Sequence, residues 1–217
     1  MTALLLIEDH SLVADSLALA LTARGIDVTI ARATTTDELL AEAGAKSFDL
    51  VLLDLDLGPL GDGGALVRPL VAADLRVLVV SGSAETTRMD AAIAAGAEGW
   101  VSKEQSYDVL IGTVLRVIAG ERLVDDARRQ QLERDARERS REHRRQLAPF
   151  DALTPREQDV LGALLEGLQA QAIAERSYVS EATVRTQIRG VLTKLGVSSQ
   201  IAAVALAREV GWHPRPR

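Results

Sequence analysis

The residues of this 217-residue chain best suited to chemistry are polar side chains that follow short apolar runs. In the stretch DLVLLDLDLG, the run Leu50–Leu53 leads directly into Asp54, and Asp56 follows one residue later. Carboxylates are rarely placed at the end of a buried strand without a use, because removing a charge from water is costly. The two aspartates therefore predict a functional site.

Three further apolar runs end in polar residues, namely Glu8 with Asp9, Ser81, and Lys103. If the runs are parallel strands, these residues share one edge of a sheet with Asp54. Close carboxylates would then repel each other by about 4 kcal/mol per pair at ~4 Å near a protein surface. A raised pKa is one way to relieve this repulsion, and a bound hard cation such as Mg²⁺ is another. We expect Mg²⁺ at Glu8, Asp9 and Asp54, with Asp56 contributing its backbone carbonyl.

The same edge carries groups that suit phosphoryl transfer. Asp54 would be the nucleophile, and the Lys103 ammonium and Ser81 hydroxyl would each hold an oxygen of a phosphoryl group on it. Taken singly, Lys103 is usually a solvated surface charge, and Glu8 with Asp9 is more often a helix cap. The complete set, with each member at the end of a separate strand, is far more specific.

Strand-like and helical segments alternate through residues 1–119. The predicted strands are Leu4–Ile7, Ile26–Ile30, Leu50–Leu53, Arg76–Val80 and Gly99–Val101. The predicted helices are Leu12–Arg24, Asp37–Ala45, a segment ending near Ala73, Thr86–Ala95 and Tyr107–Ala119. This alternation predicts an α/β domain with a doubly wound, five-stranded parallel sheet, whose ligands bind at the carboxyl ends of the strands. The segment GPLGDGG, residues 58–64, is expected to be a flexible loop.

Charge divides the chain into parts. Residues 1–119 carry 8 Lys/Arg against 17 Asp/Glu, residues 120–150 carry 9 against 7, and residues 151–217 carry 8 against 7. We expect a charged, helical linker at 120–150, with a partly disordered linker as the alternative. The absence of cysteine excludes disulfides and thiolate metal sites. No apolar run is long enough to span a membrane and no secretory signal is evident, so we expect a cytoplasmic protein without a membrane partner.

An all-α domain is predicted at residues 151–217. Thr154, Pro155 and Glu157 suit the first positions of a helix, which three more helical segments follow. In EATVRTQIRGVLTKL, from Glu181 to Leu195, apolar residues share one face, and cations lie off it. Together with the short helix before it, this segment predicts a helix-turn-helix. The alternative interpretation is a small helical bundle of another kind with an exposed basic stripe.

Four segments closely resemble the receiver domain of two-component response regulators, which is flavodoxin-like in fold. They are LLLIEDHSLV, DLVLLDLDLG, RVLVVSGS and GAEGWVSKE. The resemblance covers residues 1 to about 119. It implies that a sensor histidine kinase phosphorylates Asp54 and that Glu8, Asp9 and Asp54 help bind Mg²⁺. It also implies that Ser81 and Trp100 move as a switch, and that Asp56 and Ser83 tune the loss of phosphate.

Two positions depart from the receiver pattern. Leu57 and Gly58 replace the usual Met-Pro, which puts the shape of the phosphorylation loop in doubt, and Glu104 replaces a common Pro. The sequence DLDLG also resembles the D-x-D motif of haloacid-dehalogenase-type phosphatases, in which Asp56 would be catalytic. That family places its further acidic motif after the lysine, whereas here the acid pair precedes it. We therefore expect a regulator and no enzyme.

Residues 153–207 resemble the LuxR-type helix-turn-helix of NarL/FixJ-type regulators, although Gln187 and Gly190 replace common His and Asn. The resemblance implies that the helix from Glu181 enters the major groove of double-stranded DNA. The expected contacts to base edges and phosphates come from Thr183, Arg185, Thr186, Arg189 and Lys194. Because the charge is small, we expect a homodimer on a two-fold site, formed on phosphorylation. RNA polymerase is a further possible partner, and a phosphorylation-independent regulator is the main alternative.

Overall fold

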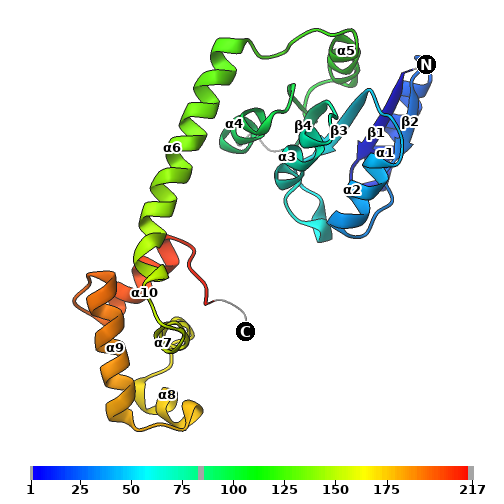
Figure 1. Ribbon diagram of the computed structural model, residues 1–217. Coiled ribbons are helices and arrows are strands. Elements are labelled where there is room, and N and C mark those ends of the chain that lie inside the picture. Colours follow the sequence, from blue (N-terminus) through cyan, green and yellow to red (C-terminus); the bar gives the residue numbers. More distant parts are fainter. Residues whose placement is uncertain (1, 83–85, 215–217) are drawn as a thin grey trace. The chain divides into compact units, whose positions relative to one another are not determined.

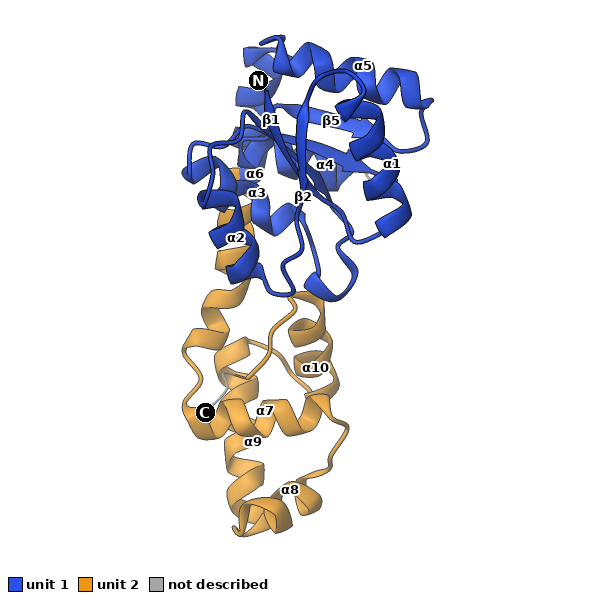
Figure 2. Ribbon diagram, turned by 90° about the vertical axis from the view of Figure 1, so that its right-hand side faces the viewer, with its two compact units in different colours: residues 1–136 blue, residues 137–217 orange. Residues whose placement is uncertain are grey.

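The computed structural model describes residues 2–82 and 86–214 (Figure 1). The described chain forms two compact units, residues 1–136 and residues 137–217 (Figure 2). The domain boundaries expected at residues 119 and 150 remain predictions, since helix α6 (Asp126–Asp151) crosses the division between the units. Ser83 lies outside the described residues.

The first unit is built on one parallel sheet. Its strands are β1 (Ala3–Ile7), β2 (Asp27–Ile30), β3 (Leu50–Asp54), β4 (Val77–Ser81) and β5 (Gly99–Ser102). The strand order is β2-β1-β3-β4-β5, and every neighbouring pair is parallel. The predicted five-stranded, doubly wound α/β fold is therefore confirmed. Asp54 and Ser81 are the last residues of their strands rather than the residues after them.

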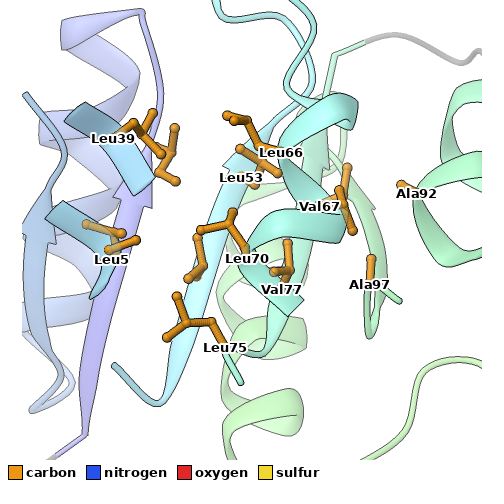
Figure 3. Close-up of a cluster of buried hydrophobic side chains, with 14 of the residues drawn as sticks. Leu5, Leu39, Leu53, Leu66, Val67, Leu70, Leu75, Val77, Ala92 and Ala97 are labelled. Atoms are coloured by element: carbon orange, nitrogen blue, oxygen red, sulfur yellow. The ribbon is translucent and has the colours of Figure 1, made fainter. Parts of the chain in front are cut away.

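Alternate side chains of the central strands enter two separate cores. Leu5 of β1 and Leu53 of β3 face the core on the α2, α3 and α4 side (Figure 3). Leu4 and Leu52, each one position earlier, face the core on the α1 and α5 side. Both faces of the sheet are thus buried, which explains why these strands read as continuous apolar runs.

Helices and a short 3-10 turn lie between the strands and after the last one. They are α1 (Ser11–Thr22), α2 (Thr36–Gly44), η1 (Gly58–Leu60), α3 (Gly64–Ala72), α4 (Thr86–Ala95) and α5 (Tyr107–Ile118). The segment that we expected to be a flexible loop therefore contains ordered structure. Leu57, just before η1, is 1% exposed, so its burial anchors this segment to the core.

The described part of the second unit, up to residue 214, contains helices and no strand. After α6 come α7 (Pro155–Leu165), α8 (Ala170–Ser177), α9 (Glu181–Leu195) and α10 (Gln200–Glu209). The predicted capping box is present, because Thr154 and Glu157 each bond the other's backbone amide. Val184, Ile188 and Val191 give α9 the buried face that its periodicity predicted.

Helix lengths in the described residues bear on membrane insertion. No single helix there is both long and apolar enough to cross a membrane. Helices α9 and α10 meet the length and composition criteria only as a pair, and they are bent by 53° relative to each other.

Candidate functional site

The parallel register brings the predicted site residues to one edge of the sheet. Ile7 pairs with Leu53 in the register of β1 and β3, so Glu8 and Asp54 occupy adjacent positions at the strand ends. Ser81 pairs with Ser102 at the ends of β4 and β5, and the Lys103 amide donates to the Ser81 carbonyl at 2.9 Å. Four strands therefore converge on the same place.

Lys103 joins two of the buried carboxylates. Its Nζ lies 2.7 Å from Oδ2 of Asp54 and also donates a hydrogen bond to the Glu8 carboxylate. The Asp54 and Glu8 side chains are only 2% and 1% exposed. Burial alone would lower the pKa of Lys103, but the hydrogen bonds that its ammonium donates to Asp54 and Glu8 outweigh it and raise the pKa above its ordinary value. Lys103 is thus a fixed cation beside the candidate nucleophile.

The acidic residues can also converge on a cation. Ligand atoms of Glu8, Asp9, His10 and Asp54 all lie within 4.8 Å of one another. Three carboxylates in this space suit a hard, oxygen-seeking cation, so the donor set fits Mg²⁺. Sequence reasoning missed His10, whose Nδ1 lies 2.7 Å from Oδ1 of Asp9. Its place directly after the acid pair was the available signal. The Asp9 charge raises the pKa of His10.

Asp56 differs from Asp54 in its surroundings. Its backbone amide donates to Oδ1 of Asp54 at 3.2 Å, while its side chain is 57% exposed and pairs with Arg88 of α4 at 2.8 Å. Arg88 was not a candidate from the sequence, since 32 residues separate it from Asp56. Ser81 is fully buried, and Trp100 of β5 is 39% exposed.

The predicted DNA-contacting residues lie on α9, whose exposed face presents four of them. Thr183 is in the first turn, where its amide bonds the Ser180 cap, and Arg189 is exposed. Arg185 forms an ion pair with Glu181 at 2.6 Å within the same helix. The Thr186 hydroxyl donates to the Ala182 carbonyl at 3.0 Å.

Lys194 has a different environment. Its Nζ lies 2.6 Å from Oε2 of Glu157, the residue that completes the capping box of α7. Any phosphate contact by Lys194 would therefore compete with a partly buried ion pair. The role of Lys194 at DNA, like the roles of the other site residues, remains a prediction.

Comparison with known proteins decides the family. The model for the response regulator receiver domain matches residues 4–115, and the model for bacterial regulatory proteins of the luxR family matches residues 151–207. This chain belongs to the response regulators. The response regulator is 31% identical over 204 residues to the nitrate/nitrite response regulator protein homolog of Haemophilus influenzae, covering 93% of this chain and 94% of that protein.

A second relative covers almost the whole response regulator. It is the DNA-binding transcriptional activator DevR/DosR of Mycobacterium tuberculosis, 32% identical over 212 residues, with 97% of this chain and 95% of that protein covered. A CheY-like receiver domain protein of Methanospirillum hungatei has a TM-score of 0.50 and 23% identity, covering 55% of this chain and 95% of that one. This structural match supports the fold alone.

The family match confirms the predicted class. The protein is a DNA-binding transcriptional response regulator, a class typically controlled through phosphorylation of its receiver domain. A receiver domain implies a histidine kinase as partner, and a luxR-type domain implies DNA. The family consists of transcription regulators rather than enzymes, which favours the regulator over the phosphatase alternative.

Proposed function

We propose that Asp54 accepts a phosphoryl group from a sensor histidine kinase and that the phosphorylated protein binds promoter DNA as a dimer in the cytoplasm. The observation that carries this proposal is the pairing of Lys103 with both Glu8 and Asp54 at the sheet edge. It provides a buried nucleophile, a fixed cation for the incoming phosphoryl oxygens and carboxylates for a metal in one place.

Each side chain has a separate task in phosphoryl transfer. An Asp54 oxygen forms the bond to phosphorus while the bond from phosphorus to the histidine nitrogen of the kinase breaks. Lys103 then exchanges its contact with the Asp54 carboxylate for one with a phosphoryl oxygen. The Ser81 hydroxyl donates to another phosphoryl oxygen. Mg²⁺, when bound by Glu8, Asp9, Asp54 and the Asp56 carbonyl, offsets the negative charge that accumulates.

The switch follows from the positions of two residues at this edge. Ser81 ends β4, and Trp100 lies on the neighbouring β5, where it pairs in register with Val79. A Ser81 hydroxyl that turns toward the phosphoryl group leaves room on the β5 side, into which the half-exposed Trp100 ring moves. This change biases the receiver between two states. Asp56 and Ser83 are proposed to tune how long the phosphorylated state lasts.

DNA binding is assigned to α9. Arg185, Thr186 and Arg189 are proposed to reach base edges, with Thr183 and Lys194 at the phosphates. Residues 151–217 hold only 8 Lys/Arg against 7 Asp/Glu, so one copy makes few phosphate contacts and binds weakly at physiological salt. Two copies on a two-fold site overcome this weakness. The bound dimer would then contact RNA polymerase.

A phosphoryl mimic tests the proposal. Beryllofluoride with Mg²⁺ should increase dimerisation and DNA affinity of the wild type but not of Asp54→Ala, as measured by gel filtration and fluorescence anisotropy. Asp15→Ala, at an exposed acid of α1, is the matched control and should respond as the wild type does. Equal behaviour of wild type and Asp54→Ala would contradict the proposal and indicate a phosphorylation-independent regulator. A monomer protecting a single half-site would contradict the dimer.

A further inference from the structure

One arginine ties helix α4 to the loop that follows Asp54. The Arg88 guanidinium donates to Oδ1 of Asp56 at 2.8 Å, to the Leu55 carbonyl at 2.8 Å and to Oδ1 of Asp62 at 2.9 Å. All three acceptors belong to the segment between Asp54 and α3, and Arg88 lies in the first turn of α4. A single side chain thus links two elements at the site's edge.

A guanidinium suits the geometry of this contact. Its planar fork reaches two carboxylates and a carbonyl at once, whereas the ammonium of a lysine presents its donors from a single point. Arg88 is 28% exposed, whereas Asp56 and Asp62 are 57% and 63% exposed. The arginine is therefore the more sheltered partner, and it binds two carboxylates that are mostly exposed.

The loop is closed upon itself around this contact. Asp56 and Asp62 form an isolated antiparallel bridge, and the Gly63 amide donates to the Leu55 carbonyl at 2.9 Å. Oδ1 of Asp62 also accepts from the Gly64 amide at 3.0 Å, at the start of α3. Arg88 therefore binds a loop whose two sides are already paired, so it fixes the direction of the Asp56 side chain rather than the presence of the loop.

The direction of Asp56 matters for the chemistry two residues away. In the loss of phosphate, a water oxygen bonds to phosphorus while the bond from phosphorus to the Asp54 oxygen breaks. The products are the Asp54 carboxylate and dihydrogen phosphate, which keeps both protons of the water. A carboxylate that hydrogen-bonds this water acts as a general base, because it accepts one proton as the new bond forms and then returns it to the phosphate. Asp56 is near enough in sequence to serve in this way if its carboxylate is free.

We propose that Arg88 is a positioning residue that keeps the Asp56 carboxylate away from the attacking water and so prolongs the phosphorylated state. This proposal rests on the proposed function, because it requires phosphorylation of Asp54. The contact observed in the structure supplies the restraint. Both terminal nitrogens of the Arg88 guanidinium donate to oxygens of the loop, and one of these oxygens belongs to the Asp56 carboxylate.

The decay rate of the phosphorylated protein tests the proposal. Full-length protein is phosphorylated with acetyl phosphate and Mg²⁺, the phosphodonor is removed, and the remaining aspartyl phosphate is measured over time. Arg88→Gln should shorten the half-life by about tenfold, below the full effect of a well-placed general base. Arg88→Lys should shorten it too, because charge without the fork does not hold Asp56. Arg68→Gln, at an exposed arginine of α3, is the matched control and should leave the half-life unchanged.

The Asp56→Asn background tests whether Arg88 acts through the Asp56 carboxylate or only by stabilising the loop. In Asp56→Asn, which cannot act as a base, Arg88→Gln should not change the half-life further. An equal shortening in both backgrounds would overturn the proposal, as would a wild-type half-life in Arg88→Gln. A wild-type protein that takes up no phosphoryl group would instead contradict the proposed function, and the present proposal with it.

Discussion

At the scale of single residues, Gly58 explains the departure from the receiver pattern. Gly58 has a φ of 50°, and a Cβ at this position would lie 2.6 Å from Oδ2 of Asp9. The buried Leu57 side chain holds the preceding residue in the core. The loop backbone therefore lies directly against one of the candidate metal ligands, an approach that only glycine permits without a shift of Asp9.

Gly58→Ala should weaken Mg²⁺ binding at least about tenfold, because the added methyl group displaces the Asp9 carboxylate from the other ligands. The left-handed backbone adds about 1 kcal/mol of destabilisation. Calorimetric Mg²⁺ titration and thermal unfolding measure the two effects separately. Gly61→Ala is the control, since Gly61 has a φ of 85° but nothing within 4 Å of a Cβ. Unchanged Mg²⁺ affinity in Gly58→Ala would contradict this role of Gly58.

At the scale of elements, the start of α7 and the last turn of α9 are joined through Glu157. Its carboxylate completes the capping box with Thr154 and pairs with Lys194 of α9 at 2.6 Å. A Cβ on Gly190 would lie 2.6 Å from Oε1 of Glu157, so this glycine makes room for the carboxylate. The glycine in α9 thus serves packing within the unit.

The Glu157 contact predicts how stability depends on pH. Burial alone would raise the pKa of Glu157, but hydrogen bonds from Lys194 and Thr154 outweigh it and lower the pKa. A lowered pKa gives stability that is fully present above the ordinary pKa of glutamate and is lost as pH falls through the lowered one. Urea unfolding of the helical unit, followed by Trp212 emission in Trp100→Phe, should show this loss. Glu157→Gln should weaken the pH dependence of the free energy of unfolding. An unchanged pH dependence in this variant would show that Glu157 is not its source.

At the scale of the whole molecule, helix α6 contributes to both compact units. In the first unit, Arg128 pairs with Asp90 of α4 at 3.1 Å, and Leu132 is 2% exposed. In the second, Phe150 is 1% exposed and stacks on Trp212 with ring centroids 5.5 Å apart. The charged segment expected to be a linker thus supplies buried residues at both of its ends.

This arrangement predicts where the helical unit can be cut. A fragment of residues 137–217 should unfold cooperatively, whereas residues 152–217, which lack Phe150, should be less stable by about 3–5 kcal/mol. Circular dichroism during thermal unfolding compares the two fragments. Phe150→Ala in the longer fragment should reproduce most of the loss. Equal melting temperatures of both fragments would show that the luxR-type domain folds without α6.

Much of this molecule follows from local sequence pattern. Apolar runs predicted the five parallel strands, and parallel strands place the residues at their carboxyl ends together. Asp54 and Lys103 were therefore expected to be neighbours, and they lie 2.7 Å apart. Periodicity likewise predicted the buried face of α9. These inferences succeed because strand and helix geometry repeats at fixed intervals along the chain.

Other features depend on which segments meet in space. Three contacts join residues that are far apart in the sequence. Arg88 and Asp56 are 32 positions apart, Gly58 and Asp9 are 49 apart, and Lys194 and Glu157 are 37 apart. No periodic pattern encodes such pairs, because each results from the packing of whole elements and from the reach of one side chain. The sequence therefore predicts which residues meet at the carboxyl edge of the sheet, and the packing of α4 and the loop after β3 decides which other side chains surround them.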